Sequence, residues 1–438
     1  MLALPKISKD FDISSSLSTQ AVTIGLIVTV IFLVIFGHMG DLISKNFIYL
    51  LGGALFGLSG LITGFAPNFP IMIVGLIVQA IGGAATAANS MGIITDTFVD
   101  KERSTALAYN SMFVSVGSLS GSPIGGLITQ FFGWHWLFLM NVPLMLILML
   151  IGSRILKVGK IDGRKIAMDL KESNWTGQAI YTVGILVMFG ANWFAIPHVN
   201  PFVNFMIFLV IGGIITVYSF LQDDKAKHPW IDPKVLHNII FLTSTGVLFL
   251  SMFVNAMSNI MLPFYLQNFL GYNVGVSGLI VALQSVTMFV LSPIVGKLAA
   301  KANRQQFLVT IGLIMLTISQ VGYALYPAHQ NLLWIIIPIV VNGIGMGFTL
   351  TPNNTLTMSL VAPNDTGIAG SVNSLFRTLG MAMGITFTTT LLAVEIPGVK
   401  QISSSLGNTF MNAFRFIFII AALISAASIV LNLVRKTK

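Results

Sequence analysis

Long apolar runs separated by short polar loops occupy almost the whole chain. Thirteen such runs can be drawn, at 18–39, 46–66, 69–97, 104–130, 136–156, 174–194, 202–222, 239–268, 276–299, 305–326, 331–358, 367–392 and 409–434. A helix of about 20 apolar residues is long enough to cross the roughly 30 Å of hydrocarbon in a bilayer. The pattern therefore predicts an all-α integral membrane protein with thirteen transmembrane helices.

The same pattern repeats along the chain, because residues 79–121 return almost in register as residues 342–384. The matched positions are Gln79 and Asn342, Gly82 and Gly345, Ala106 and Ala369, Asn110 and Asn373, Gly117 and Gly380, and Gly121 and Gly384. A duplicated set of membrane helices is typical of transporters built from two half-bundles around a central site. The repeat predicts two pseudo-symmetric half-bundles.

Counting runs along the repeat locates an insertion. The first run ends in the motif that begins at Gly37, and the repeat of this motif, which begins at Gly296, ends the ninth run. Equivalent runs are therefore eight apart, whereas two six-helix halves joined directly would place them six apart. The runs at 174–194 and 202–222 are therefore predicted to be an inserted helix pair. We expect an N-terminal half-bundle over 1–156, a cytoplasmic loop and the inserted pair over 157–235, and a C-terminal half-bundle over 236–438.

The start of the chain also has a counterpart in the repeat. Leu4-Pro5 followed by Phe11 matches Leu262-Pro263 followed by Phe269. The eighth run then has no partner in the first half. We expect that one N-terminal helix is missing, by truncation, a late annotated start or a shortened gene, and that restoring it gives fourteen helices.

Charge placement sets the expected topology. Of 438 residues, 55% are hydrophobic and 8% charged, and the net charge is +9, whereas soluble domains are about 25% charged. Most Lys and Arg residues lie in loops that follow odd-numbered runs, so the positive-inside rule places those loops and the C-terminus in the cytoplasm and the N-terminus outside. The basic charge is thus explained by topology rather than by nucleic acid.

Other chemistry is not indicated by the sequence. There is no cysteine, the histidines lack metal-ligand spacing, and no nucleotide-binding loop occurs. We expect neither an enzyme nor a resident cofactor or metal.

Three motifs carry a resemblance to a known family. Gly37-His-Met-Gly-Asp41-Leu-Ile-Ser-Lys45 returns as Gly296-Lys-Leu-Ala-Ala300-Lys-Ala-Asn-Arg304. The others are Gly117-x-x-x-Gly121-Ser-Pro123-Ile-Gly125-Gly126 and Trp134-His-Trp-Leu-Phe-Leu-Met-Asn141-Val-Pro143. Together they resemble the major facilitator superfamily, and in particular its 14-helix drug:proton antiporters (QacA/EmrB type).

The resemblance implies a monomeric, bacterial plasma-membrane transporter of small molecules that is coupled to protons. It implies a gating loop motif formed by Gly37, Asp41, Lys45, Arg103, Gly296 and Arg304. It also implies that Gly117, Gly121, Pro123, Gly125 and Gly126 form an antiporter motif, in which a helix bend governs opening and limits proton leak. Small residues there would equally permit tight helix packing.

Polar residues form stripes on two related runs. On the third run they are Gln79, Thr86 and Ser90, which share one helix face, and the repeat gives Asn342, Thr349 and Asn353. The resemblance implies that both helices line a central substrate cavity. The alternative is that these side chains hydrogen-bond neighbouring helices, which is what we expect for Asn89, off the stripe.

Arg377 is the candidate with the sharpest chemistry. It lies ten residues into its run, about 15 Å deep at 1.5 Å per residue, and its repeat position is Val114. Intramembrane charge is costly and usually faces an aqueous cavity or a partner. We interpret Arg377 as a contact for substrate, anion or coupling ion, with satisfaction by helix carbonyls as the alternative; Arg415, near the outer surface, is expected to be an interfacial anchor.

The expected coupling group is not visible in the sequence. None of the fourteen acids lies deep in a run, Asp96 being the nearest, and Leu76 stands where the family has an arginine. The resemblance implies an exporter of drugs or amphipathic molecules that works by alternating access and proton antiport. Open alternatives are export of an anionic or zwitterionic metabolite, and a non-transporting, inactive paralogue.

Overall fold

The structure of the protein is a computed structural model. It describes residues 4–98, 124–158, 173–194, 196–223, 237–299, 304–329, 331–360, 366–397 and 406–435, together with the single residues 106, 110, 113, 117, 121, 171 and 230. Within these ranges all regular secondary structure is helical.

Sixteen helical elements are described in chain order. They are α1 (Leu4–Asp10), α2 (Ser15–Leu42), α3 (Lys45–Gly64), α4 (Phe69–Thr97), α6 (His135–Leu139), α7 (Asn141–Ile155), α9 (Trp175–Met188), the 3₁₀ turn η1 (Gly190–Asn192), α10 (Pro201–Asp223), α12 (Ile239–Pro263), the π-helical η2 (Phe264–Phe269), α13 (Val274–Ala299), α14 (Gln305–Ala324), α15 (Leu332–Ser359), α16 (Thr366–Glu395) and α17 (Gly407–Val434). Eleven spans in the described residues are long and apolar enough to cross a membrane, and α9 is a shorter apolar helix. These match twelve of the predicted runs, which confirms the all-α membrane fold; most of the run at 104–130 lies outside the described residues.

Polar residues fix where many of the helices begin. The side chains of Ser14, Ser44, Asn68, Asn238 and Asn331 each accept a hydrogen bond from a backbone N–H in the first turn of the helix that follows. Such caps satisfy donors that have no partner within the helix. The short polar loops between apolar runs therefore also determine the helix starts.

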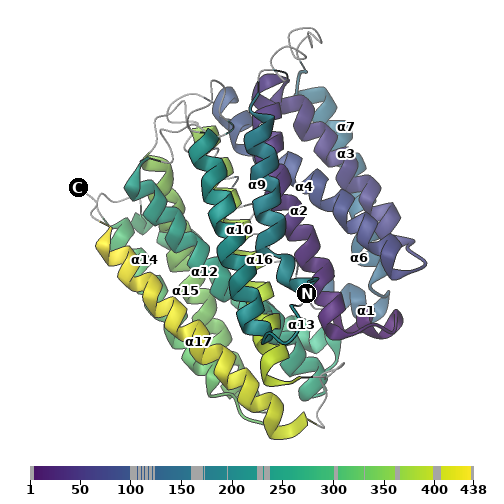
Figure 1. The fold of residues 1–438 in the computed structure, drawn as a ribbon, viewed down its shortest axis with the longest axis vertical. Helices are drawn as coiled ribbons and strands as arrows, with labels where there is room; N and C mark the ends of the chain where they lie inside the picture. The colour runs from purple at the N-terminus through teal and green to yellow at the C-terminus, as the bar shows by residue number, and fades with distance from the viewer. Residues whose placement is uncertain are drawn as a thin grey trace.

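Helix packing in the first half is repeated in the second. α3 packs on α4 as α14 packs on α15, and α2 packs on α4 as α13 packs on α15. Glycine makes the closest approach in both halves. A Cβ at Gly82 would lie 2.6 Å from the Gly52 carbonyl oxygen, and one at Gly345 would lie 3.0 Å from that of Gly312. The sequence repeat thus corresponds to a repeated helix arrangement (Figure 1).

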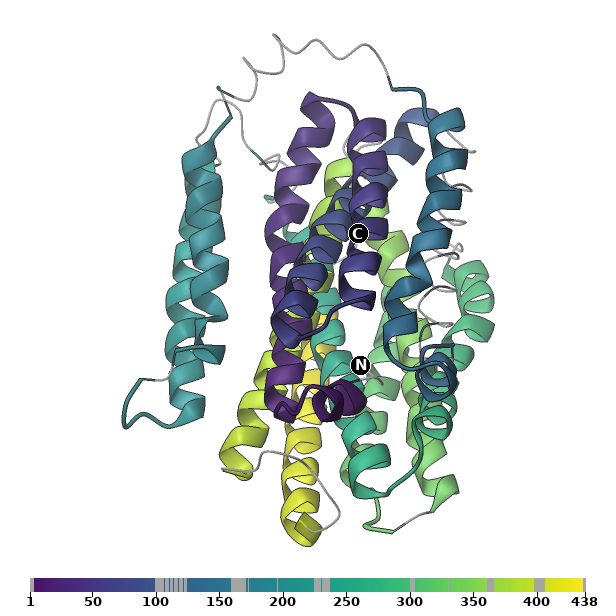
Figure 2. The same cartoon turned by 90° about the vertical axis from the view of Figure 1, so that its right-hand side faces the viewer.

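The two halves meet along a seam formed by α2 and α4 on one side and α16 on the other. α9 and α10 pair with each other outside this bundle, α9 against α2 and α10 against α16 (Figures 1 and 2). We call the end of the bundle that carries Lys45, Arg304 and Arg435 the basic end. α2, α4, α10, α13, α15 and α17 end there, and α3, α12, α14 and α16 begin there.

Candidate gate and substrate pathway

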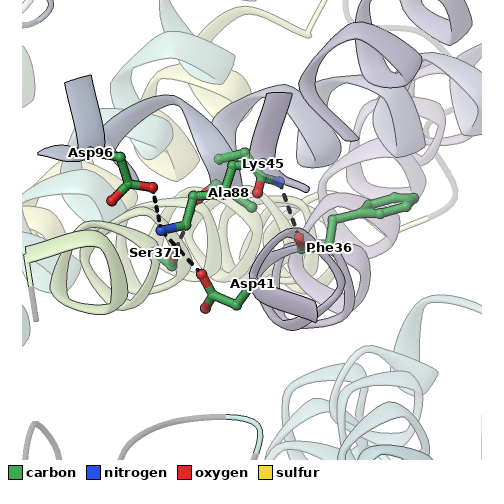
Figure 3. A network of polar contacts seen from close by, with 7 residues as sticks. Phe36, Asp41, Lys45, Ala88, Asp96 and Ser371 are labelled. Atoms are coloured by element: carbon green, nitrogen blue, oxygen red, sulfur yellow. Dashed lines mark hydrogen bonds and ion pairs between the residues drawn. The ribbon is translucent and has the colours of Figure 1, made fainter. Parts of the chain in front are cut away.

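A charge cluster joins three helix termini at the basic end. Lys45 Nζ lies 3.3 Å from Asp41 Oδ1 and 2.9 Å from Asp96 Oδ2 (Figure 3). The two carboxylate side chains are more than half exposed. Exposed ion pairs contribute about 0–1 kcal/mol to stability. The cluster therefore sets the relative positions of the ends of α2, α3 and α4 more than it stabilises the fold.

Asn89 fastens α4 to α2 just below this cluster. Its Nδ2 donates to the Phe36 carbonyl oxygen at 3.0 Å and to that of Ala85 at 3.0 Å. A Cβ at Gly40 would collide with the Asn89 side chain. Position 40, within the loop motif, therefore requires glycine, because a larger residue would displace the buried Asn89 side chain. Asn89 itself makes a helix-packing contact, as expected from its position off the polar stripe.

The same region contains the contact between the two halves. Ser371 Oγ on α16 donates to the Ala88 carbonyl oxygen on α4 at 3.1 Å (Figure 3). A Cβ at Gly37 would lie 3.8 Å from Ser371 Oγ. Three predicted gating residues, Gly37, Asp41 and Lys45, are therefore brought together beside the seam.

The second copy of the loop motif is placed differently. A Cβ at Gly296 on α13 would lie 3.8 Å from Thr351 Cγ2 on α15, and Arg304 is exposed at the start of α14. Arg103 lies outside the described residues. In the described residues, the first copy of the motif lies beside α16, whereas Gly296 of the second copy faces α15.

The polar stripe of α4 is partly open. Gln79 is half-buried, and within the described part of the chain no hydrogen bond is made by its side chain. Thr86 Oγ1 and Ser90 Oγ donate to carbonyl oxygens of α4 itself, Thr86 to Gly83 at 2.9 Å and Ser90 to Ala87 at 3.2 Å. These hydroxyls therefore need no partner on another helix, and Gln79 retains its hydrogen-bonding groups for a ligand or water.

The related stripe of α15 is wholly buried, which differs from the expectation that Asn342, Thr349 and Asn353 face a cavity. Asn342 Nδ2 donates to Ser319 Oγ on α14 at 3.1 Å. Thr349 packs against Gly312, also on α14, where a Cβ would meet its hydroxyl. We therefore assign these three side chains to helix packing, because α12, α14 and the end of α17 close over this face of α15.

Asn353 belongs to a buried cluster that the sequence did not reveal. Arg435, just beyond α17, is only 2% exposed, and its Nη1 donates to Ser244 Oγ on α12 and to Asn353 Oδ1, both at 3.0 Å. Burial lowers the pKa of Arg435 to about 10, so the guanidinium stays charged at neutral pH. The charge pattern marks Arg435 only as a cation near the C-terminus. Nothing in the sequence pairs it with Asn353, which lies two helices earlier in the chain.

Arg377 lies in the middle of α16 on the face between α12 and α15. One turn earlier, Asn373 Nδ2 donates to Asn354 Oδ1 on α15 at 3.2 Å. One turn later, Gly380 packs on the Phe249 carbonyl of α12. Arg377 is partly buried, and within the described residues its guanidinium has no hydrogen bond or ion pair. A charged group at this depth requires water, an anion or a ligand, so Arg377 remains the best candidate for ligand contact.

Among the described residues, no acid lies beside Arg377. The six acids that the structure describes lie at helix ends or in loops: Asp10, Asp12, Asp41, Asp96, Asp223 and Glu395. The region around Arg377 is therefore electropositive as far as the described residues define it.

The glycines of the antiporter motif differ in how closely other helices approach them. Among the described residues, a Cβ at Gly117 or Gly121 would meet no other atom within 4 Å, and one at Gly125 would touch only Leu137, at 3.7 Å. Gly126 instead packs against α13 of the other half, because a Cβ at Gly126 would be 3.1 Å from Gly278 Cα. Pro123 lies outside the described residues. Gly126 thus marks a second contact between the halves, away from the basic end.

Comparison with known proteins agrees with this architecture. Residues 1–385 match the family model described as Major Facilitator Superfamily. The chain is 27% identical to "Riboflavin transporter RibZ" of Clostridioides difficile, over 90% of this chain and 84% of that protein. It is 25% identical to "Multidrug export protein EmrB" of Haemophilus influenzae, over 89% of this chain and 75% of that protein.

The fold is also similar to a solved structure from work on substrate recognition in proton dependent oligopeptide transporters. The TM-score is 0.66 with 14% identity, and the match covers 98% of this chain and 93% of that one. At this identity the likeness concerns the fold alone.

Proposed function

Because the chain belongs to the Major Facilitator Superfamily, we propose that this membrane transporter exports drugs or other amphipathic small molecules by alternating access, in exchange for protons. We further propose that it works as a monomer in the plasma membrane with its basic end and C-terminus in the cytoplasm. In this proposal the moving bodies are the half-bundles 1–156 and 236–438, and 157–235 contributes the inserted pair.

The observation that carries alternating access is the nature of the seam. At the basic end the halves meet through the Ser371–Ala88 hydrogen bond, and along α2 and α16 they share an apolar cluster that includes Val30, Val34 and Val372. Away from that end, Gly126 meets Gly278. A net hydrogen bond is worth only about 0.5–1.5 kcal/mol. Contacts of this kind can open at one end while the other end stays closed, as rocking of two half-bundles requires.

Arg377 favours a second candidate substrate class. A partly buried guanidinium without a carboxylate repels a cationic drug and attracts anionic or acceptor-rich molecules. One relative is named for riboflavin and another for multidrug export. An anionic or zwitterionic metabolite, or a planar carbonyl-rich molecule, is therefore the alternative to a cationic drug, and a non-transporting paralogue is the alternative to both.

Transport by purified protein in proteoliposomes tests the proposed function. With an imposed pH gradient we expect movement of ethidium, or of riboflavin for the second class, to exceed that of protein-free vesicles. Addition of a protonophore is expected to remove at least about nine-tenths of this signal, because an antiporter then loses its driving force. Transport that is insensitive to the protonophore would contradict coupling, and absence of transport for both substrate classes would favour the inactive paralogue.

A further inference from the structure

The inserted helix pair is attached to both sides of the seam. α9 packs on α2, where the buried Tyr181 Oη donates to the Val30 carbonyl oxygen at 3.1 Å. α10 packs on α16. α2 belongs to the first half and α16 to the second (Figure 1). Any movement that separates α2 from α16 must therefore disturb at least one of these attachments.

The attachment to α2 includes a hydrogen-bonded cluster at the basic end, which we call the tryptophan node: His38, Ser173, Asn174, Asp223 and Trp230. The rings of His38 and Trp230 are 4.3 Å apart between centroids, and His38 Nε2 lies 2.8 Å from Ser173 Oγ. His38 directly follows Gly37 of the gating loop motif. The node therefore reaches the part of α2 that faces Ser371.

The interior of the node is tightly bonded. Trp230 Nε1 donates to the Asn174 carbonyl oxygen at 2.7 Å, and the Trp230 backbone N–H donates to Asp223 Oδ2 at 2.8 Å. Asn174 Nδ2 donates to Asp223 Oδ1 at 3.1 Å. Asp223 and Trp230 are both buried. Hydrogen bonds to a buried carboxylate are among the stronger ones in proteins, so the node binds the segments before α9 and after α10 into one unit.

The attachment to α16 is of another kind. Phe205 and Phe202 of α10 contact Phe387 of α16, with ring centroids 5.8 and 6.2 Å apart. Phe205 and Phe387 are buried. Aromatic contacts tolerate sliding better than hydrogen bonds, because their attraction varies gently with geometry. Of the two attachments, the one on Phe387 is the easier to shift.

We propose that the inserted pair is a lever fixed to α2 by the tryptophan node and sliding on α16 at Phe387. Trp230 is then a positioning residue for α2, and the pair moves with the first half. The proposal rests on the alternating access proposed above, since only separation of α2 from α16 gives the lever a movement to follow.

The chain has no cysteine, so introduced pairs can be bridged selectively. We would bridge His38→Cys with Ser173→Cys, and in a second protein Phe205→Cys with Phe387→Cys, using a short thiol-reactive linker that a reductant removes. Each protein serves as its own reference before bridging. Because His38→Cys removes the contact between the His38 and Trp230 rings, we expect the first bridge to keep transport at or above its rate before bridging. The second bridge is expected to lower transport by about tenfold, reversibly. Loss of transport with the first bridge, or unchanged transport with the second, would overturn the proposal.

Hydrogen exchange of the folded protein in nanodiscs tests the lever without any substrate. Trp230→Ala is expected to speed exchange in the basic-end half of α2 by at least about tenfold, with α16 unchanged. Trp230→Phe keeps a ring against His38 and should restore most of the protection, and Trp334→Ala removes an exposed tryptophan as control. If Trp230→Ala leaves exchange in α2 unchanged, the proposal that Trp230 positions α2 is wrong. If Trp230→Ala speeds exchange in α2 but the wild-type protein transports nothing, the result counts against the proposed function alone.

Discussion

Replacement of Arg377 by alanine is expected to weaken the apparent affinity for an anionic or acceptor-rich substrate by about 10- to 150-fold, with a smaller loss for Arg377→Lys. Hydrogen bonds to a charged group contribute about 1.5–3 kcal/mol, and tenfold in affinity corresponds to about 1.4 kcal/mol. The guanidinium has no hydrogen bond or ion pair among the described residues, so its removal leaves no polar group there without its partner. The measurement is the concentration dependence of initial transport rates in proteoliposomes.

The matched control for Arg377 is Arg415 on α17, which is exposed. Arg415→Ala removes the same charge from the chain and should leave the affinity unchanged. If the substrate is a cationic drug, the sign reverses, and Arg377→Ala should bind it more tightly. Equal transport of both substrate classes by wild type, Arg377→Ala and Arg377→Lys would contradict a substrate contact.

Gly384→Ala is expected to destabilise the protein by about 1–3 kcal/mol, the usual cost of overpacking a close contact. A Cβ at Gly384 would collide with the Phe253 carbonyl oxygen, and one at Gly380 would collide with that of Phe249. Both neighbours are backbone atoms of α12, so the helices themselves would have to separate. The measurement is the thermal loss of the monodisperse peak in detergent.

The sequence repeat supplies the control for this substitution. Gly121 is the repeat counterpart of Gly384, and in the described part of the chain a Cβ there would meet no other atom within 4 Å. Gly121→Ala should therefore leave stability unchanged or raise it by up to about 1 kcal/mol through higher helix propensity. Equal destabilisation by the two substitutions would contradict the packing difference. A loss of transport in a stable Gly121→Ala protein would instead support the gating role of the antiporter motif.

The sequence predicted the fold well because lipid leaves few choices. A run of apolar residues has to become a helix, and the repeat then determines how the helices pair. The sequence also places Gly37, Asp41 and Lys45 in one short motif, and residues so close along the chain stay close in space whatever the rest of the chain does. It did not indicate that Asp96 joins Lys45.

Features that depend on packing between distant helices could not be predicted in the same way. The polar stripe of α15 has the same spacing as that of α4. Asn342 of α15 is nevertheless buried against α14, whereas Gln79 of α4 is half-buried. Helical periodicity says which residues share a face and does not say what covers that face. For the same reason the burial of Arg435, and the node that links His38 to Trp230, could be found only in three dimensions.

The most direct test of alternating access is a reversible lock across the seam. A Cβ at Gly37 lies near Ser371 Oγ, so Gly37→Cys and Ser371→Cys can form a disulfide that ties α2 to α16 in a chain with no other cysteine. Rocking half-bundles predict that the oxidised protein transports nothing and that reduction restores the rate of the unlocked variant. Transport by the oxidised protein at the rate of the reduced one would contradict the account.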